Sequence, residues 1–402
     1  MRDELLGLEI KERDYVVVGA MPDDLLALGY RPVGKDFPVF LHPDTGEQYA
    51  LARTERKTGS GYYGFETRFS PEVTLDEDLA RRDLTINAMA RSPDGRLIDP
   101  YGGQSDLSAR LLRHVSPAFV DDPLRVLRVA RFAARFAPLG FEIAAATLQL
   151  MRDIVASGEM GALVPERVWQ ETHRALAEKC PATYFEVLHT CGALAAVFPE
   201  IEALYGVPQP VRWHPEIDTG LHTIQVLEVA AELSGDTAVR FASLVHDLGK
   251  GCTPRDLWPS HVGHEEAGVK LIDGLCQRLR VPNEHRELAM LTARYHGLAH
   301  RAAELRPATI VDLFMNTDAF RRPDRFEQFL LACEADARGR GARLRQSDYP
   351  QARLLRDARE AAARVQLDPE LLASGKGPVI AQELRAARIE AVRNIDRRQT
   401  EV

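Results

Sequence analysis

Two acidic residues near the beginning of the chain have the spacing of a metal site. Glu12 and Asp14 are separated by one residue and run directly into the apolar stretch Tyr15–Val18. Alternate residues of a strand lie on the same face, so both carboxylates are expected on one side of a strand edge. Carboxylate oxygens are the ligands that hard divalent cations prefer. We therefore predict a divalent-metal site at Glu12 and Asp14.

A second group of residues suggests a different kind of metal. His246 and Asp247 are adjacent at the end of an apolar helical segment in "SLVHDLGKG", and His222 lies in another helical segment, "GLHTIQV". Imidazole and carboxylate groups on packed helices bind divalent transition metals. Such a metal can activate water and polarise a phosphoryl oxygen. We predict a transition-metal site at His222, His246 and Asp247.

Five further histidines follow this pair in the sequence: His261, His264, His285, His296 and His300. A single histidine is more often an ordinary core or surface residue than a ligand, and this is our interpretation of His285 and His300. The joint pattern His…His-Asp-x-Gly-Lys is much harder to explain in that way.

Arginines are concentrated on one predicted helix. In "DDPLRVLRVARFAARF", Arg125, Arg128, Arg131 and Arg135 fall within a roughly 120° arc at about 100° per residue. Upstream, "RRDLTINA" places Arg82 and Asp83 before an apolar segment. Arginines on a helix usually form a solvated face, but guanidinium groups also suit phosphate and ribose oxygens.

The elements that must position these residues change in type along the chain. Residues 14–100 carry strand and turn signals, with a hairpin predicted around Pro43–Gly46 and a Gly-rich segment at 57–65. Short helices are predicted at 22–29 and 75–90, and a long helix from Asp122 to about Phe136. Further helices are predicted at 145–157, 165–178, 182–194, 221–234, 237–249, 264–280, 285–297, 324–338 and 350–365. The fold class is therefore α+β: a small mixed-sheet head followed by an all-helical neck and a second helical domain.

Composition excludes several classes of protein. The chain has 402 residues, 45% hydrophobic and 27% charged, and no apolar run approaches the roughly 18 residues of a membrane helix. Its five cysteines include no CxxC pair, which favours reduced thiols and a cytoplasmic location and argues against a zinc knuckle. The net charge of −8 repels phosphate, so a nucleic-acid partner would need a local basic patch.

Taken together, the motifs resemble the bacterial CCA-adding enzymes, which are tRNA nucleotidyltransferases of the class shared with bacterial poly(A) polymerases. The resemblance is strongest to the multifunctional CCA subgroup with a C-terminal HD domain, and it covers essentially the whole chain. The stretches that carry it are "KDFPVFLHP" (35–43), "YALARTERK" (49–57), "RRDLTINA" (81–88), "LLRHVSPAF" (111–119), "DPLRVLRVARFAAR" (122–135), "WHPEIDTG" (213–220) and "HDLGKG" (246–251).

For the head, the resemblance implies template-independent addition of C, C and A to tRNA from CTP and ATP. Glu12 and Asp14 match the Mg²⁺-binding acids, usually Asp-x-Asp in the family. Asp122 and Arg125 match the pair that reads the incoming base, and residues 59–64 match a loop that helps to switch from CTP to ATP. The positions that match nucleotide-contacting arginines are Arg2, Arg82, Arg128 and Arg131.

For the second site, the resemblance implies an HD-type phosphohydrolase acting on 2′,3′-cyclic phosphates, 2′-nucleotides and related phosphoesters, with Ni²⁺ or another divalent transition metal. His222, His246 and Asp247 match the ligand positions. In that superfamily, an aspartate much further along the sequence completes the set of metal ligands. Asp318, in "NTDAFRRP", has suitable spacing, and Asp336, in "CEADARGR", is the rival.

The resemblance also sets expected boundaries: head 1–120, neck with base-recognition helix 121–206, HD domain 207–322 and tRNA-binding tail 323–402. The family begins with a strand and a Gly-Gly turn, whereas this chain begins inside that motif at Met1-Arg2-Asp3. We expect Tyr15–Val18 to be partly unpaired as a result. Either the start is misassigned or the head is impaired.

The expected partners are CTP, ATP and the acceptor and TΨC arms of tRNA, with no membrane, for a monomer or homodimer. Two alternative functions remain. One is a bacterial poly(A) polymerase, a class that typically lacks the HD domain and carries a basic tail. The other is a tRNA-binding HD phosphohydrolase with an inactive head.

Overall fold

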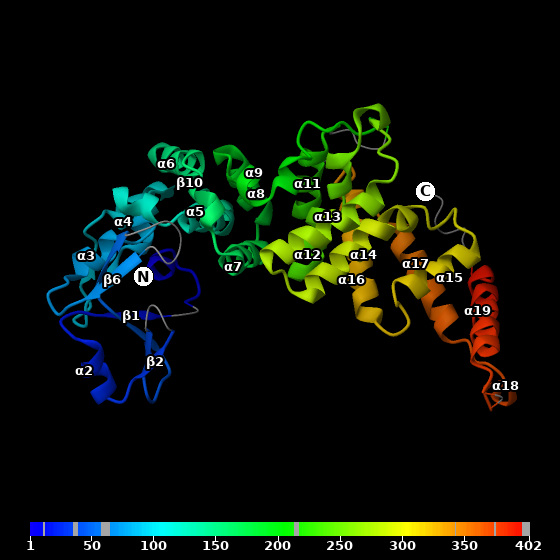
Figure 1. Ribbon diagram of the computed structural model, residues 1–402, viewed down its shortest axis with the longest axis horizontal. Helices are drawn as coiled ribbons and strands as arrows, with labels where there is room; N and C mark the ends of the chain where they lie inside the picture. The colour runs from blue at the N-terminus through cyan, green and yellow to red at the C-terminus, as the bar shows by residue number, and fades with distance from the viewer. Residues whose placement is uncertain are drawn as a thin grey trace. The chain divides into compact units, whose positions relative to one another are not determined.

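The computed structural model describes residues 1–10, 13–34, 39–57, 65–212, 217–341, 343–373 and 375–395. The chain divides into two compact units, which we call the N-terminal unit (Met1–Ala175 and Thr183–Val197) and the C-terminal unit (Leu176–Ala182 and Phe198–Val402). In Figure 1 the labelled strands belong to the blue-to-green part of the chain, and the remainder is helical. This confirms the predicted α+β class.

The N-terminal unit begins with helix α1 (Arg2–Leu5) and a four-stranded mixed sheet in the order β1-β4-β3-β2. Strand β1 (Asp14–Val17) runs parallel to β4 (Gln48–Leu51). Strands β4 and β3 (Val39–Leu41) form the predicted hairpin, and β2 (Arg31–Val33) adds antiparallel to β3. Among the described residues β1 pairs with β4 alone, so its other edge is open, as expected for Tyr15–Val18.

A small apolar core stabilises this sheet. Leu25 of helix α2 (Pro22–Ala27) packs against Phe40 of β3 and Leu51 of β4, and all three are almost fully buried. The proline at the first turn of α2 suits a helix start, because its missing N–H would have no intrahelical partner there.

The second half of the head is built from short elements. They are the hairpin β5 (Arg53–Lys57) and β6 (Phe65–Phe69), helix α3 (Leu75–Ala80), the 3₁₀ turn η1 (Thr85–Asn87), strands β7 (Ala90–Arg91) and β8 (Leu97–Ile98), helix α4 (Gly103–Ala109) and strand β9 (Leu111–Leu112), which pairs with β10 (Glu142–Ile143).

The prediction of one helix over 75–90 is wrong, because the helix ends at Ala80. The Asp83 carboxylate accepts the N–H of Leu84 at 2.8 Å, and Leu84 forms a β-bridge with His114. A short polar side chain that bonds its own neighbouring backbone competes with helix continuation.

The arginine-rich helix α5 spans Leu124–Phe136 and begins two residues later than predicted. The Asp122 carboxylate accepts the N–H of Leu124 at 3.0 Å, which forms an Asx turn that leads into the helix. The turns η2 (Pro117–Asp121), η3 (Ala137–Leu139) and η4 (Glu159–Ala162) and helices α6 (Ala145–Ala156), α7 (Pro165–Leu176), α8 (Pro181–Cys191) and α9 (Ala193–Val197) complete the neck.

The C-terminal unit is helical throughout its described residues. Its elements are α10 (Pro199–Glu202), α11 (Thr219–Leu233), α12 (Thr237–Val245), η5 (Leu248–Cys252), η6 (Arg255–Leu257), α13 (His264–Leu279), α14 (Asn283–His300), α15 (Pro307–Asn316), α16 (Pro323–Arg338), α17 (Pro350–Ala363), α18 (Pro369–Ala373) and α19 (Gly377–Arg393).

The helices that were predicted in this unit are confirmed, whereas α10, α15, α18 and α19 were missed. Each of these four carries a proline in its first turn, a start signal that was available in the sequence. Helix α12 packs against α14 and α16, helix α13 packs against α14 and η5, and helix α11 packs against α12 and α16. Val226, Val229 and Ala230 of α11 pack against Ala335 of α16. None of the described helices combines the length and apolarity that a membrane crossing requires.

Two glycines allow the backbones of η5 and α13 to touch. A Cβ atom added to Gly249 would lie 1.9 Å from the carbonyl oxygen of His264 and 2.7 Å from the backbone nitrogen of Gly268. No side chain larger than hydrogen fits between these backbones. The contact brings the segment that follows His246 against the start of α13.

Replacing Gly249 by alanine is therefore expected to lower the free energy of unfolding by about 3 kcal/mol, because the clash is with backbone atoms that cannot rotate away. Urea unfolding followed by circular dichroism measures this. The matched control is Gly235→Ala, since a Cβ there meets nothing within 4 Å. Equal stability of the two variants would contradict the proposed close approach.

Candidate functional site

Six metal-binding side chains converge in the core of the C-terminal unit. They come from four helices and from the segment after α12, and three groups of three place their ligand atoms within 4.8 Å of one another. The residues are His222, His246, Asp247, His264, His296 and Asp336. All are buried except His264, whose side chain is 15% exposed.

The two carboxylates lie at the centre of this histidine–aspartate cluster. Asp336 Oδ1 is 3.1 Å from His222 Nε2 and 3.7 Å from His246 Nε2. Asp247 Oδ2 is 3.1 Å from His246 Nε2 and 2.6 Å from Lys250 Nζ. The structure thus brings the predicted His222, His246 and Asp247 together.

The pKa shifts favour the metal-binding form of the two carboxylates and of His296, whereas Asp247, against the effect of burial, raises the pKa of His246 and of His264. Burial raises the pKa of Asp247, but the charges of His246 and Lys250 outweigh it and hold that pKa well below its usual range. Burial likewise raises the pKa of Asp336, but the charges of Arg340 and His300 outweigh this effect and hold that pKa well below its usual range. Burial lowers the pKa of His296 to about 3, so its imidazole is neutral. Ionised carboxylates and neutral imidazoles are the forms that bind metals.

Several buried atoms of the cluster have no hydrogen-bond partner in the described part of the chain: His246 Nε2, Asp247 Oδ1 and His264 Nε2. Buried polar atoms without partners are costly, and a metal ion would satisfy all three. These residues therefore fit a transition metal.

Asp318 is not part of this cluster, which corrects the preference for it as the closing carboxylate. It lies just after α15, is 27% exposed, and is ion-paired with Arg321 at 2.9 Å. A solvated carboxylate on the surface cannot join a buried cluster. The rival, Asp336 of α16, occupies the central position instead.

Asp336 is held in place by a chain of further contacts. Its Oδ2 accepts the Nε2–H of His300 at 2.5 Å, and Tyr349 OH is 3.0 Å from His300 Nδ1. Arg340 Nη2 lies 3.3 Å from both carboxylate oxygens. These contacts direct Oδ1 toward the histidines. His300 lies outside the three groups of ligand atoms, so its interpretation as a residue other than a ligand stays a prediction, and its contact with Asp336 was not foreseen.

Sequence reasoning did not assign His264 and His296 to the cluster. His296 and His300 are four residues apart on α14 and so share one helix face, which was a usable signal. His285, by contrast, is placed as predicted for a core residue, because it bonds Thr237 and packs against Phe241.

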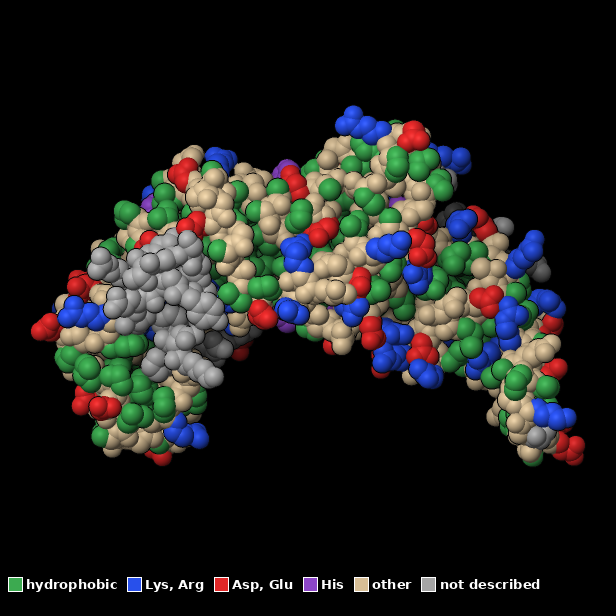
Figure 2. Space-filling view, in the orientation of Figure 1, with side chains coloured by type: hydrophobic (Ala, Val, Ile, Leu, Met, Phe, Trp, Pro, Cys, Tyr) green, Lys and Arg blue, Asp and Glu red, His purple; other side chains and the backbone are tan. Residues whose placement is uncertain are grey.

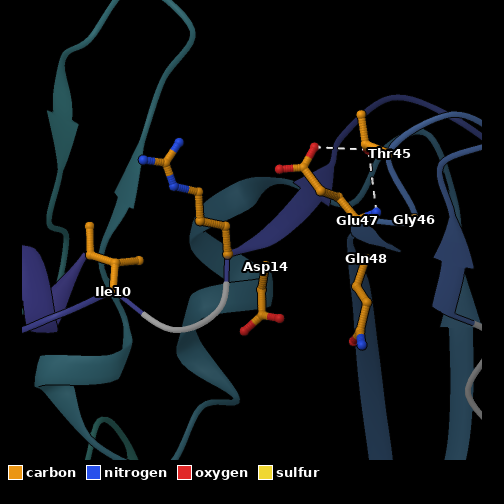
Figure 3. A pocket seen from close by; sticks show the side chains of 7 residues that line it. Ile10, Asp14, Thr45, Gly46, Glu47 and Gln48 are labelled. Atoms are coloured by element: carbon orange, nitrogen blue, oxygen red, sulfur yellow. Dashed lines mark hydrogen bonds between the residues drawn. The ribbon is translucent and has the colours of Figure 1, made fainter.

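In the head, Asp14 lies at the start of β1 on the rim of a cavity of about 440 Å³. The lining residues are Ile10, Arg13, Asp14, Thr45, Gly46, Glu47 and Gln48. Figure 3 shows Asp14 and its sheet neighbour Gln48 extending the same way, whereas Glu47 extends oppositely. The Glu47 carboxylate accepts hydrogen bonds from the hydroxyl groups of Tyr15 and Thr45, at 3.1 Å each. Glu12 lies outside the described residues.

The predicted nucleotide-binding residues of the head are partly joined by one network. The Asp83 carboxylate accepts hydrogen bonds from Asn87 at 2.8 Å and from Arg128 at 2.7 Å. Arg2 donates to Asn87 Oδ1, and its guanidinium lies 4.8 Å from the centre of the Phe132 ring. Arg2 and Arg128 are thus positioned by neighbouring polar groups.

The remaining arginines have different environments. Arg131 is buried, and its Nε donates a hydrogen bond to Glu171 Oε2 at 2.5 Å. Arg125 is also buried, and donates to the carbonyl oxygens of Ala118 and Arg81 at 2.5 Å each. The alternative reading of these arginines as a solvated face does not apply to Arg125 and Arg131.

Two other predicted positions lie on either side of this group. Arg82 Nη2 is 3.2 Å from Asp78 Oδ2, and Arg82 is about one third exposed. The Asp122 carboxylate is 3.1 Å from Arg167 Nη2. Neither contact joins these residues to the Asp83 carboxylate in the described structure.

Comparison with known proteins bears on both sites. Family profiles described as "Poly A polymerase head domain", "Probable RNA and SrmB- binding site of polymerase A" and "HD domain" match residues 1–113, 140–205 and 219–322. A "Multifunctional CCA protein" from Nitrosococcus oceani is 63% identical over 393 residues, which cover 98% of this chain and 96% of that protein. Another of the same name, from Thioalkalivibrio sulfidiphilus, is 60% identical over 395 residues, with the same coverage.

The chain belongs to the multifunctional CCA protein family. Solved structures of CCA-adding enzymes share its fold. The enzyme from Thermotoga maritima complexed with tRNA has a TM-score of 0.61 and 19% identity, covering 98% of this chain and 86% of that one. The Bacillus stearothermophilus enzyme in complex with CTP has a TM-score of 0.62 and 21% identity with the same coverage.

The head of this multifunctional CCA family member has a strongly perturbed carboxylate. Burial raises the pKa of Asp83, but the charge of Arg128 and hydrogen bonds from Asn87 and Arg128 lower it to about 2, against 3.8 ordinarily. Because the folded-state pKa is depressed, the contact stabilises the fold above about pH 4 and is lost as the pH falls toward 2.

We expect Asp83→Asn to destabilise the protein by an amount that is constant above pH 4 and shrinks by about 2 kcal/mol as the pH falls to 2. Urea unfolding of both proteins from pH 7 to pH 2 measures this difference. A difference that does not change with pH would show that Asp83 is not ionised against Arg128.

Proposed function

We propose that the chain adds and repairs the 3′-terminal CCA of tRNA, using CTP and ATP without a nucleic-acid template, and that its HD domain hydrolyses phosphoesters. The observation that carries this proposal is the 63% identity with a multifunctional CCA protein over 98% of the chain, which includes both sites. Solved relatives of the same fold hold CTP, ATP or tRNA.

In the head, Asp14 and Glu12 are the proposed ligands of Mg²⁺. The exposed Asp14 carboxylate beside the cavity is the oxygen donor that Mg²⁺ prefers. When bound, the ion would supply charge neutralisation of the triphosphate and activation of the tRNA 3′-hydroxyl for in-line attack on the α-phosphate.

Arginines of the head and of the neck helix α5 are proposed to bind the incoming nucleotide. Arg128 and Arg2 present their guanidinium groups from the Asp83–Asn87 network, which fixes their directions. Arg82 and Arg131 complete the set. Guanidinium groups bind phosphate and ribose oxygens by paired hydrogen bonds. Restricting their motion beforehand reduces the entropy lost on binding.

Base selection is proposed for Asp122 and Arg125. Asp122 offers carboxylate acceptors and Arg125 offers guanidinium donors at the start of α5. A donor and an acceptor in fixed positions can match the hydrogen-bonding edges of C and A and reject G and U, because an unmatched buried polar group is costly. No nucleic-acid template is then needed.

In the HD domain, the histidine–aspartate cluster is proposed to bind Ni²⁺ or another divalent transition metal. The substrates would be 2′,3′-cyclic phosphates, 2′-nucleotides and related phosphoesters. Two cations flank the cluster, Lys250 beside Asp247 and Arg340 beside Asp336, and they favour an anionic ligand. When bound, the metal supplies an activated water. This activity would clean damaged tRNA ends before nucleotide addition.

The proposed tRNA contacts are made by the neck and the C-terminal helices. Residues 343–393 contain ten Arg and Lys against seven Asp and Glu, in a chain whose net charge is −8. Figure 2 shows Lys and Arg side chains spread over the region of α15, α17 and α19. Phosphate contacts of this kind can recognise the shape of the acceptor and TΨC arms without reading sequence. The protein is proposed to act in the cytoplasm as a monomer or homodimer.

The presence of an HD domain at residues 219–322 disfavours the poly(A) polymerase alternative. The inactive-head alternative is distinguished from the proposed function by incubating the chain with labelled CTP and ATP and with tRNA that lacks its 3′ end. Incorporation of two C residues and one A supports the proposal. If neither nucleotide is incorporated while phosphoester hydrolysis persists, the inactive-head alternative replaces it.

We expect Asp14→Ala to reduce nucleotide incorporation by about a thousandfold, because the loss of a metal ligand removes about 4 kcal/mol of transition-state stabilisation. Phosphoester hydrolysis by the HD domain should not change. Asp23→Ala, an exposed acid on α2, is the matched control and should leave both activities intact. Equal loss of both activities in Asp14→Ala would contradict two separate sites.

Asp336 and Asp318 are expected to differ sharply. Asp336→Ala should lower the rate of 2′,3′-cyclic AMP hydrolysis by about a thousandfold or more, because it removes a central carboxylate from the cluster. Asp318→Ala should keep full hydrolysis, since its side chain is on the surface. CCA addition should survive in both variants. Loss of hydrolysis in Asp318→Ala alone would overturn the assignment of Asp336.

A further inference from the structure

The buried residue Gln209 contacts the ammonium group that lies beside the histidine–aspartate cluster. Gln209 is 2% exposed, and its Oε1 accepts a hydrogen bond from Lys250 Nζ at 2.6 Å. The same ammonium lies 2.6 Å from Asp247 Oδ2. Gln209 precedes the HD profile, which begins at residue 219, so that profile does not include it. Its contact with Lys250 nevertheless places it next to the proposed hydrolytic site.

The backbone around Gln209 is fixed by hydrogen bonds. The Gln209 N–H donates to the carbonyl oxygen of Ile217 at 2.6 Å. The carbonyl oxygen of the preceding residue, Pro208, accepts a hydrogen bond from His261 Nε2 at 2.8 Å. Pro208 also forms a β-bridge with Asp218. The Gln209 side chain therefore enters the interior from a backbone that is held on both sides.

His261 links this segment back to Lys250. Its Nδ1 lies 2.6 Å from the hydroxyl oxygen of Thr253, and that hydroxyl lies 2.8 Å from the carbonyl oxygen of Lys250. These contacts close a ring, in which the backbone of Lys250 and its ammonium are joined through the segment that carries Gln209. A lysine side chain that is already held in one position loses less conformational entropy when it binds a ligand.

The ring leaves hydrogen-bond donors without acceptors. Because an ammonium can only donate, the atom of the Gln209 amide that faces Lys250 is the oxygen, and the remaining atom is the nitrogen Nε2. This Nε2 is buried and has no hydrogen-bond partner in the described part of the chain. Lys250 has three N–H groups, and the described residues accept from it at two positions. Buried donors without acceptors are costly, so these donors indicate an acceptor ligand.

A phosphate group matches these donors. Its oxygens accept several hydrogen bonds at once, and its negative charge complements the Lys250 ammonium. The Gln209 amide holds this ammonium without cancelling its charge, whereas a second carboxylate beside Asp247 would make the position net negative. The side chain of Lys250 is 10% exposed and that of Asp247 only 2%, so the ligand approaches from the side of the lysine.

We propose that Gln209 is a substrate-positioning residue of the C-terminal unit. Its Oε1 holds Lys250, and its Nε2 donates a hydrogen bond, together with the Lys250 ammonium, to the phosphate group of the substrate. This inference rests on the proposed phosphoester hydrolysis and adds a determinant of substrate affinity to that site. The contact is made equally to the bound substrate and to the transition state, so its loss raises KM and leaves kcat nearly unchanged.

The test compares KM with kcat for the hydrolysis of 2′,3′-cyclic AMP by the full chain. Gln209→Met keeps the length of the side chain and removes the amide, so we expect KM to rise about tenfold while kcat stays within roughly twofold. Inorganic phosphate should weaken as a competitive inhibitor by the same factor as KM rises. CCA addition should not change.

Gln209→Glu is a second variant, which keeps the test decisive if circular dichroism shows Gln209→Met to be misfolded. It retains an oxygen for Lys250 but removes the amide donor and adds negative charge, so KM should rise by about a hundredfold. The matched control is Gln277→Met, because Gln277 is an exposed glutamine of α13 that bonds Asp273 at 2.9 Å. Its KM and kcat should equal those of the unchanged protein.

The outcomes separate this inference from the proposed function. Unchanged KM and unchanged inhibition by phosphate in the Gln209 variants, whether or not kcat falls, would show that the amide supports only the fold. That result would overturn the positioning role while leaving phosphoester hydrolysis in place. Absence of hydrolysis in the unchanged protein would overturn the proposed hydrolytic function itself.

Discussion

A carboxylate that is removed from water must be matched by positive charge, and both candidate sites are arranged around that requirement. In the head, Asp83 is matched by Arg128 and an asparagine amide, and the pair fixes the direction of a guanidinium group. In the C-terminal unit, Asp247 and Asp336 are matched only partly by Lys250 and Arg340, since His246 Nε2, Asp247 Oδ1 and His264 Nε2 have no hydrogen-bond partner among the residues that the structure describes. The same constraint thus gives a fixed guanidinium group beside Asp83 in one unit and a cluster that suits a divalent cation beside Asp247 in the other.

Features encoded by neighbouring residues could be predicted from the sequence. The hairpin around Pro43–Gly46, the long helix after Asp122 and most C-terminal helices carry local signals such as turn residues, first-turn prolines and periodic apolar positions. The pair His246-Asp247 is adjacent in the chain, so its role did not depend on knowing the fold. Glu12 and Asp14 are separated by only one residue, so this pattern is also local in the sequence, although only Asp14 lies within the described residues.

Features that depend on packing between distant helices could not be predicted. Asp318 and Asp336 both follow the motif at plausible distances, and only the position of α16 against α11 and α12 decides between them. His264 joins the cluster because Gly249 and Gly268 let η5 and α13 touch, which no spacing rule indicates. The helix predicted over 75–90 failed for a local reason, since the Asp83 side chain bonds the next backbone N–H.

The contacts around Asp336 have a consequence for how this protein can be divided. The HD profile ends at residue 322, yet Asp336 and the Tyr349 that supports His300 both come later in the chain. A fragment cut at that profile boundary would lack a central carboxylate and the hydroxyl that orients its neighbour. The structural unit that contains the histidine–aspartate cluster is therefore longer than its recognised sequence signature, because the segment after residue 322 supplies Asp336 and Tyr349 to it.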